Sequence, residues 1–425
     1  MGILESYTDR IKLYVKNAGW YFFSSMFVAI VGLAMNPLMA MNLDPLDYAI
    51  VGYFSSYNLL LLPLITLNID KFYSRQYFFI PEGKRIDLEH TIVSTLLVIG
   101  SCSLVLFLAG FYVFYSNTEH SFPFWPYALL AFVQIHLNNI AGLYLSKLKI
   151  TRQAKKFAII NIGQCLLTQG ALILFVVVLH KGALGKLLAP LLISFLFAVY
   201  SCVKLLHKKH FDRQIMKTAL KFGYPLAFAA LFWYFLSGVD KFFLEKLNDS
   251  YTFGLYNVGA SIALYLQIFY SSVSTTFAPD MYKSIAERNT RKLLTVGGVI
   301  LATVIISNLL FVAFAPLIID LLTAGRYTDS CLYARIFAIQ NITMAVYLLM
   351  GSIMTGYGYV KQQLVLRICA AAVAVLIYKY MIDSFGFVGA AWGQVLVFLF
   401  AFVITAAFLI IKARKSGPET FETNN

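Results

Sequence analysis

The sequence predicts an all-α integral membrane protein with about twelve transmembrane helices, arranged as two six-helix bundles with a central cavity. Hydrophobic residues make up 60% of the 425 positions, charged residues make up 13%, and the mean hydropathy is +0.74. This is more apolar surface than one water-soluble core can bury. The apolar residues also gather in runs of about twenty, and basic clusters separate these runs in a regular alternation.

Twelve apolar runs have the length of a membrane span. A helix rises 1.5 Å per residue, so about twenty residues cross the ~30 Å of hydrocarbon in a bilayer. In chain order, the predicted spans are residues 18–41, 48–69, 91–115, 125–146, 157–179, 186–206, 219–243, 252–278, 293–323, 332–356, 362–382 and 386–411. The gaps between them are too short to fold as separate domains, so we expect the function to reside within the membrane.

The basic residues predict the orientation of the spans. If the N-terminus lies in the cytoplasm, 27 of the 34 Lys and Arg residues fall on the inner side and 7 fall on the outer side. Cytoplasmic loops of membrane proteins carry such an excess of positive charge. An odd number of spans would disrupt the alternation, so we predict twelve spans with both termini in the cytoplasm.

A basic stretch near the midpoint predicts two lobes. Lys204 to Lys221 is the most basic part of the chain and contains His207-Lys208-Lys209-His210. We interpret it as the linker between an N-terminal lobe, residues 1–208, and a C-terminal lobe, residues 209–425.

The two predicted lobes begin alike. In each of them, basic residues precede a long span that contains a proline. The following span then opens with related residues, Asp47 to Gly52 in one lobe and Thr252 to Asn257 in the other. Because six is an even number, the two copies share one orientation, and a cavity can form between them.

Several other classes of protein are disfavoured. The net charge of +14 lies in short clusters between apolar runs, which is typical of membrane topology and not of a nucleic-acid-binding surface. The five cysteines have no CxxC or Cys/His spacing, so they predict neither a zinc site nor a disulfide framework. No GxxxxGK[ST] segment is present, which excludes ATP hydrolysis by this chain as the source of energy. We therefore predict no catalytic residues, no metal, no cofactor and no nucleic-acid partner.

Four segments of the second half carry a resemblance to a known family. They are Gly223-Tyr224-Pro225-Leu226, Ser237 to Leu244, Phe253-Gly254-Leu255-Tyr256 and Phe277 to Lys283. Their order and spacing, together with twelve spans in two halves, resemble the polysaccharide transport family of the MATE-like flippase superfamily. This family includes the O-antigen and capsule repeat-unit flippases. The first half of the chain matches the family mainly in architecture.

The resemblance implies a fold, a cargo and a location. The fold would be two six-helix bundles that face one another in a V around a hydrated cavity. The protein would be an inner-membrane flippase for an undecaprenyl-diphosphate-linked oligosaccharide, working by alternating access. The expected partners are this polyprenyl diphosphate glycan, membrane lipid and a coupling ion, H+ or Na+. The polyprenyl tail can stay in lipid, whereas the sugars and the diphosphate need a polar and preferably cationic route.

Few charged residues enter the spans, where each costs about 2.5–3.5 kcal/mol at the bilayer centre. Arg367 is the deepest cation, roughly 9 Å along its helix from Lys361, and is a candidate ligand for a diphosphate. Alternatively, its long side chain extends to the inner interface. Asp240 and Lys241 lie near the outer end of the seventh span, where the carboxylate is a candidate proton acceptor and the ammonium a candidate phosphate ligand. The alternative for this pair, and for Arg335 in the tenth span, is an interfacial ion pair or a contact with lipid headgroups.

Amide side chains provide candidate sugar ligands because they both donate and accept hydrogen bonds, as glycan hydroxyls require. In the fourth span, Gln134 and Asn138 share one helix face, whereas His136 and Asn139 share the other. One pair is expected to bind sugar and the other to join helices. The ordinary pKa of a histidine lies near neutral pH, so His136 is either a buried bundle histidine or a proton relay.

A second polar stripe follows in the fifth span. Asn161, Gln164 and Thr168 fall within about 60° of one another at 100° per residue. Contact with the sugars and hydrogen bonding between helices are both open interpretations.

Two other functions remain as alternatives. A membrane enzyme acting on lipid-linked glycans would require a substantial outer loop with catalytic residues, and the predicted loops are short. A cation-coupled multidrug exporter of the same superfamily would favour buried carboxylates within the lobes. Here Asp and Glu total 20 and cluster at helix ends or in loops, which disfavours the exporter.

Overall fold

The computed structural model describes residues 2–77, 79–206 and 211–415, and within them it contains helices and no strands. The predicted all-α class is therefore confirmed. His207 to His210, the centre of the predicted linker, lie outside the described residues. The structure divides into two compact units, Met1–Leu231 (unit 1) and Phe232–Asn425 (unit 2). This division falls inside one helix and describes packing, so the functional lobes 1–208 and 209–425 stay a prediction.

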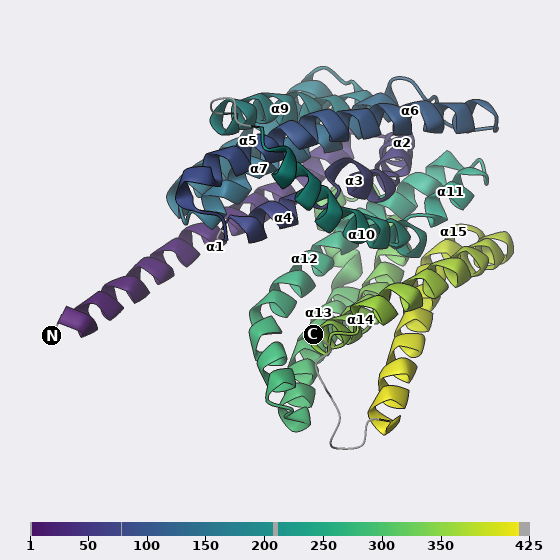
Figure 1. Cartoon of the computed structure of the whole chain (residues 1–425). Coiled ribbons are helices and arrows are strands. Elements are labelled where there is room, and N and C mark those ends of the chain that lie inside the picture. Colours follow the sequence, from purple (N-terminus) through teal and green to yellow (C-terminus); the bar gives the residue numbers. More distant parts are fainter. Residues whose placement is uncertain (1, 78, 207–210, 416–425) are drawn as a thin grey trace. The chain divides into compact units, whose positions relative to one another are not determined.

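Unit 1 contains the helices of the first half (Figure 1). Its elements are α1 (Gly2–Asn42), α2 (Pro45–Ser56), α3 (Asn58–Thr66), α4 (Ile69–Gln76), η1 (Glu82–Lys84), α5 (Arg85–Thr95), η2 (Leu96–Gly100), α6 (Ser101–Ser116), α7 (Tyr127–Ile150), α8 (Ala154–Leu172), η3 (Ile173–Val178), α9 (Gly182–Leu205) and the larger part of α10 (Arg213–Ser237).

Unit 2 contains the end of α10 and the helices that follow it. These are α11 (Asp240–Glu245), α12 (Ser250–Ala286), α13 (Thr290–Thr323), η4 (Thr328–Ser330), α14 (Cys331–Gly356) and α15 (Val360–Lys415). The helices α12, α13 and α14 pack against one another, and α14 also packs along α15 (Figure 1).

Eleven helical segments of the described residues are long and apolar enough to cross a membrane. They are Gly19–Asn42, Pro45–Thr66, Glu82–Ser116, Tyr127–Ile150, Ala154–Val178, Gly182–Leu205, Arg213–Ser237, Ser250–Ala278, Thr290–Thr323, Thr328–Gly356 and Val360–Lys412.

The last of these segments has 53 residues, which at 1.5 Å per residue is more than twice the thickness of the hydrocarbon layer. Its helix is broken at Gly386, where φ is 56° and ψ is −135°, and Figure 1 shows the sharp bend of α15 in yellow. A backbone with this φ is readily adopted by glycine alone. The segment therefore crosses twice, and the predicted total of about twelve transmembrane helices is confirmed.

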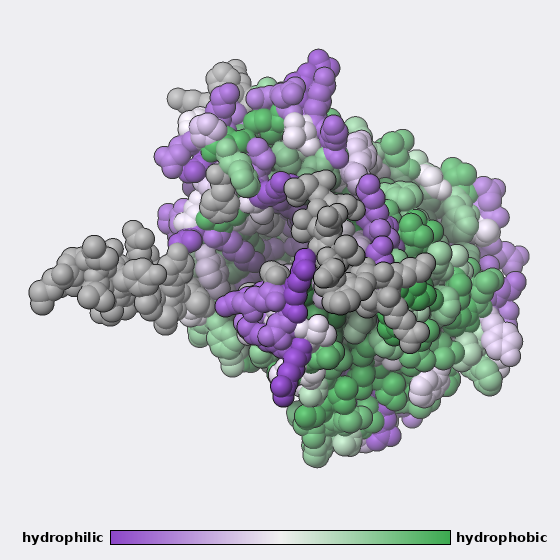
Figure 2. Space-filling view, turned by 60° about the horizontal axis from the view of Figure 1, so that its bottom comes forward, coloured by the Kyte–Doolittle hydropathy of each residue, from purple (hydrophilic) through white to green (hydrophobic). Residues whose placement is uncertain are grey.

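The surface agrees with a membrane environment. Large apolar side chains stand exposed on many helices, for example Leu106 on α6, Leu317 on α13 and Leu376 on α15. Figure 2 shows broad hydrophobic areas on one face, beside places where hydrophilic side chains gather. Apolar surface of this extent is expected to contact lipid.

A break in the helix backbone shapes the core of unit 1. Leu67 and Asn68, between α3 and α4, both adopt the left-handed conformation, with φ of 46° and 51°. The hydroxyl of Thr66 accepts a hydrogen bond from the Asn68 amide at 3.2 Å, which helps to hold the break.

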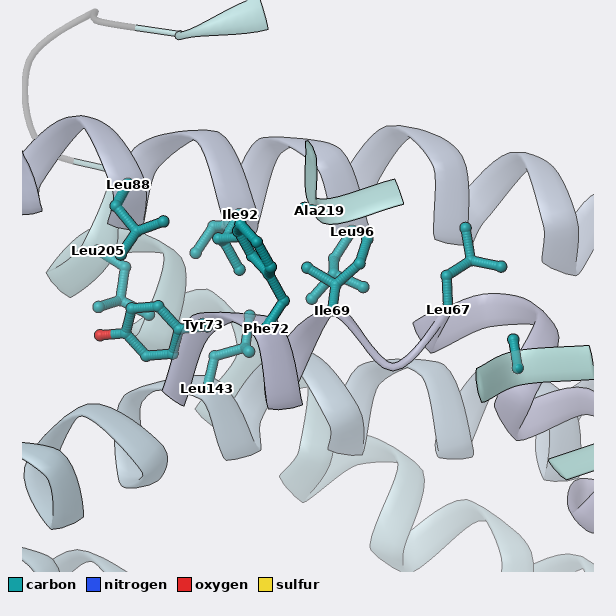
Figure 3. Packing of buried hydrophobic residues seen from close by; sticks show 12 residues of the cluster. Leu67, Ile69, Phe72, Tyr73, Leu88, Ile92, Leu96, Leu143, Leu205 and Ala219 are labelled. Atoms are coloured by element: carbon teal, nitrogen blue, oxygen red, sulfur yellow. The ribbon is translucent and has the colours of Figure 1, made fainter. Parts of the chain in front are cut away.

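An apolar cluster packs around this break (Figure 3). Its buried members are Leu67, Ile69, Phe72, Tyr73, Leu88, Ile92, Val93, Leu96, Leu143, Leu205, Ala219 and Ala227. They come from the break itself, α4, α5, η2, α7, α9 and α10, so one cluster joins most of the unit.

Gly223 on α10 is where this packing is tightest. A Cβ atom at Gly223 would overlap the carbonyl oxygen of Leu67, a backbone atom with little freedom to move. We expect Gly223→Ala to destabilise the protein by about 3 kcal/mol or to prevent folding, because an overpacked core has to shift backbone. Thermal unfolding in detergent and the monodisperse fraction on size exclusion would measure this effect.

The matched control is Gly163→Ala on α8, because no atom lies within 4 Å of the position of its Cβ. Alanine is favoured over glycine in a helix by about 0.5–1 kcal/mol, so this variant should be as stable as the parent or slightly more stable. Equal unfolding temperatures for the two variants would show that the Gly223 contact is not a constraint.

Candidate functional site

The predicted amides of unit 1 lie on two neighbouring helices. On α7, Asn138 is exposed and Gln134 is half-buried, whereas on α8, Asn161 and Gln164 are half-buried. The Gln164 amide donates to Oδ1 of Asn138 at 3.4 Å. The structure thus brings two of the four predicted amides into contact, on a part of unit 1 that the unit's own packing leaves open.

The position of this amide pair is unusual for a membrane span. Asn138 lies in the middle of Tyr127–Ile150, and Gln164 lies in the middle of Ala154–Val178. Amides that face hydrocarbon are left without full hydrogen bonding, at a cost of several kcal/mol each. An exposed amide pair at this depth therefore favours a hydrated surface over a lipid-facing one.

His136 lies on the other face of α7 and is 4% exposed. Its Nε2 atom is 3.1 Å from the Ser101 hydroxyl on α6, so the histidine joins two helices. Gly100 fits against the imidazole, since a Cβ at this glycine would come to 2.7 Å from Cε1. The bond to Ser101 is a contact of the bundle, and the role of His136 in proton transfer stays a prediction.

Asp240 is the most enclosed of the predicted residues, with 0% of its surface exposed. It is the first residue of α11, and its Oδ2 atom accepts hydrogen bonds from the hydroxyl of Tyr256 on α12 and, at 3.1 Å, from the amide of Gln394 on α15. Its Oδ1 atom is buried without a hydrogen-bond partner among the described residues. Three elements of unit 2 thus meet at one carboxylate.

Aromatic rings surround Tyr256, one of the two donors to this carboxylate. Tyr256 packs against the rings of Phe337 and Tyr333 on α14 and against Phe387 on α15, at centroid distances of 5.1, 5.6 and 6.4 Å. Asp240 itself is fully buried, and Tyr256 and Gln394 are the side-chain donors to its Oδ2 atom among the described residues. A buried carboxylate held by two donors is poised to bind a proton or a cation.

The predicted cations have different environments. Lys241 follows Asp240 in the chain and is half-buried, and Arg367 is half-buried on α15. Arg335 is exposed on α14, and its Nε atom donates to the carbonyl of Val312 on α13 at 3.2 Å. Helix-to-helix bonding therefore accounts for part of the donor capacity of Arg335.

The structure also shows a buried ion pair that the sequence analysis missed. Nζ of Lys147 on α7 lies 2.7 Å from Oε2 of Glu89 on α5, and the Glu89 side chain is 4% exposed. The hydroxyl of Tyr73 on α4 donates to Oε1 of Glu89 at 3.4 Å. Burial and the Glu89 carboxylate raise the pKa of the Tyr73 phenol well above its ordinary value, so the phenol remains a donor.

Some of these residues could have been recognised as candidates from the sequence. Glu89 borders the third predicted span, where an acid is easily taken for a loop residue, and Lys147 counted only toward the orientation. Gln394 is the one amide of the last predicted span, a signal that was available. Its contact with Asp240 was not, because the two residues are 154 positions apart.

Comparison with known proteins places this fold in a family. The model of a family described as polysaccharide biosynthesis protein matches residues 14–285, more than half of the chain. An uncharacterized membrane protein of Methanocaldococcus jannaschii is 22% identical over 265 residues, which is 58% of this chain and 63% of the relative. The chain thus matches about three fifths of the length of that relative.

Solved structures share the fold at low sequence identity. An inward-facing multidrug resistance MATE family transporter of the MOP superfamily aligns with a TM-score of 0.66 and 17% identity over 92% of this chain and 96% of its own. The lipid II flippase MurJ in an inward closed conformation aligns with a TM-score of 0.63 and 13% identity over 94% of each chain. A MOP superfamily transporter from Pyrococcus furiosus aligns with a TM-score of 0.53 and 16% identity, also over 94% of each chain.

These likenesses establish a MATE-like fold, and the family match confirms the resemblance first inferred from the segments between Gly223 and Lys283. The chain belongs to the polysaccharide biosynthesis protein family, and its fold is MATE-like.

Proposed function

We propose that this protein is a flippase that moves undecaprenyl-diphosphate-linked oligosaccharide repeat units across the inner membrane by alternating access, driven by an ion gradient. The lobes 1–208 and 209–425 would rock against each other, with both termini in the cytoplasm. Membership of the polysaccharide biosynthesis protein family and the MATE-like fold support a flippase or transporter of lipid-linked cargo. The identity of the glycan, the coupling to an ion gradient and the inner-membrane location go beyond this support and are proposed.

The observation that carries the proposal is the amide pair Asn138 and Gln164. An open polar surface in the middle of two spans is of no use to a protein that only anchors in lipid, but it suits hydroxyl-rich cargo. Gln134 and Asn161 on the same two helices extend the proposed sugar contacts. His136 would act beside them through its bond to Ser101.

We assign the anionic part of the cargo to the predicted cations Arg367, Lys241 and Arg335. A diphosphate needs positive charge while it is away from water. Asp240 is the proposed ion-coupled group, because its carboxylate is buried and has one oxygen without a partner among the described residues. The coupling ion would be H+ or Na+.

The test of this function is translocation in liposomes. The purified protein is reconstituted with a fluorescent undecaprenyl-diphosphate oligosaccharide, and protection from a membrane-impermeant quencher is followed with and without an ion gradient. We expect Asn138→Leu with Gln164→Leu to lower the initial rate about tenfold. Two lost hydrogen bonds at about 0.5–1.5 kcal/mol each give a change of this size.

The matched control is Thr303→Val on α13. Thr303 is half-buried within a span, as Gln164 is, but its hydroxyl donates to the carbonyl of Val299 in its own helix at 2.8 Å, so its loss should leave the rate unchanged. A wild-type translocation rate in the double leucine variant would show that the amide pair does not bind the cargo.

A cation-coupled multidrug exporter is the second candidate, and Asp240 is the observation that favours it. The clustering of carboxylates at helix ends and in loops disfavours an exporter, and Asp240 too lies at a helix end, the start of α11, but it is fully buried. In the same liposomes, uptake of cationic dyes without movement of any lipid-linked glycan would identify the protein as a multidrug exporter.

A further inference from the structure

Asp47 in unit 1 joins the first turns of two helices. Its Oδ2 atom accepts from the Asp44 amide at 2.9 Å, just before α2, and its Oδ1 atom accepts from the Ala183 amide at 2.7 Å, in the first turn of α9. Gly182 is needed at this contact, because its φ is +52° and a Cβ would come to 2.5 Å from Oδ1. Both carboxylate oxygens are therefore committed to main-chain donors.

One turn further along α9, the positively charged Lys186 lies near the first turn of α2. Its Nζ atom lies 3.7 Å from the centroid of the Tyr48 ring, a short cation–π contact with a buried tyrosine. The Lys186 side chain is half-buried between Gly185 and Leu187, which are both buried. Among the described residues, no carboxylate forms an ion pair with this ammonium, although the field of Asp47 reaches it.

The local charges do not cancel. Each helix N-terminus carries the equivalent of roughly +0.5 charge, so the first turns of α2 and α9 together offset about one negative charge, which is that of Asp47. The charge of Lys186 is then left over, with a ring face in place of a hydrogen-bond acceptor. The ammonium of this half-buried lysine has three N–H donors, and the ring face accepts none of them as a conventional hydrogen bond, so they are open to an anion.

We propose that Lys186 and Tyr48, beside the first turns of α2 and α9 that Asp47 already neutralises, form a binding site for a phosphate group. A lysine binds phosphate as a point charge, and the Tyr48 ring fixes the direction of the side chain. The phosphate comes either from a membrane lipid headgroup or from the diphosphate of the cargo. The second source rests on the proposed function, whereas phosphate binding itself does not.

The experiment measures binding without requiring transport. The full chain is placed in nanodiscs of phosphatidylcholine, and its melting temperature is followed as inorganic pyrophosphate is added or as phosphatidylglycerol replaces part of the lipid. A ligand that binds the folded state raises the melting temperature with its concentration. We expect a rise for the parent chain, no rise for Lys186→Met, and an unchanged rise for the control Lys181→Met, an exposed lysine at the same helix end.

Each outcome has a defined meaning. A response to pyrophosphate in phosphatidylcholine supports a site for a cargo-type phosphate, and a response to phosphatidylglycerol alone supports a lipid headgroup. Without either probe, Lys186→Met should melt no lower than the parent, because methionine fills similar space and removes an uncompensated charge. Equal responses of Lys186→Met and the parent to both probes would overturn the site.

A lower melting temperature of Lys186→Met without any probe would also overturn it, since the ammonium would then be a structural group. If the methionine variant does not fold, Lys186→Arg and Lys186→Gln decide the question. The arginine variant keeps the charge and should keep the response, whereas the glutamine variant should lose it. The same response in both variants would contradict the proposal.

Discussion

Glu89→Gln is expected to destabilise unit 1 by about 3 kcal/mol, the lower end of what breaking a buried ion pair costs. Glutamine has the shape of glutamate but no charge, so the Lys147 ammonium would be left enclosed without a counterion. The lower end applies because the Lys147 side chain is 21% exposed and keeps some contact with water. The loss should appear as faster hydrogen exchange in α5 and α7 and as a lower melting temperature.

The matched control for this prediction is Glu82, three residues before the start of α5. Glu82 pairs with Arg85 at 2.9 Å, but its side chain is 86% exposed, and such surface pairs contribute about 0–1 kcal/mol. Glu82→Gln should therefore have little effect. Combining Glu89→Leu with Lys147→Met should restore most of the stability, because an apolar pair of similar volume often replaces a buried ion pair without loss. Equal effects of Glu89→Gln and Glu82→Gln would show that the buried pair contributes no more than the exposed one.

Asp240→Asn is expected to reduce the gradient-driven rate of translocation at least tenfold while the protein still folds. The amide keeps the size of the side chain and can still accept from Tyr256 or Gln394, but it can no longer gain and lose a charge. A hydrogen bond to a charged group is worth about 1.5–3 kcal/mol, which is about tenfold or more in rate if that bond is made and broken in the cycle. The liposome assay with and without an imposed ion gradient measures the effect.

Asp249→Asn is the control for this substitution. Asp249 caps α12 by accepting from the Thr252 amide at 3.0 Å, and asparagine is an equally good cap. Its rate should match that of the parent. Tyr256→Phe adds a second comparison, because it keeps the ring and removes one donor to the carboxylate. Its translocation rate should fall between those of the parent and Asp240→Asn. Full gradient stimulation in Asp240→Asn would exclude this carboxylate from coupling.

The spans were predictable because the hydrocarbon layer imposes one length on every crossing helix. Apolar runs of that length predict two spans, 362–382 and 386–411. In the structure both belong to the single helix α15, which is kinked at Gly386. Local backbone events were not predictable in this way. The expected span 48–69 ends early, at a break at Leu67 and Asn68, where no glycine or proline indicates a left-handed backbone.

The candidate site was predictable only residue by residue. Polar side chains within apolar runs stand out, so Asp240, His136 and the amides were found. Their partners depend on how distant helices pack, and no single sequence reveals that Gln394 reaches Asp240 or that Glu89 reaches Lys147 across 58 positions. The contact of Lys186 with Tyr48 likewise depends on the packing of α9 against α2, which the sequence does not reveal.

The apolar cluster of unit 1 has a consequence for biogenesis. Two of its buried members, Ala219 and Ala227, belong to α10, the last helix of that unit to leave the ribosome. The preceding helices must therefore wait in the membrane with Leu67 and Phe72 incompletely covered until α10 has been inserted. Translation through this helix is the earliest moment at which unit 1 can mature, and a pause before it would expose a partly folded intermediate to the proteases of membrane quality control.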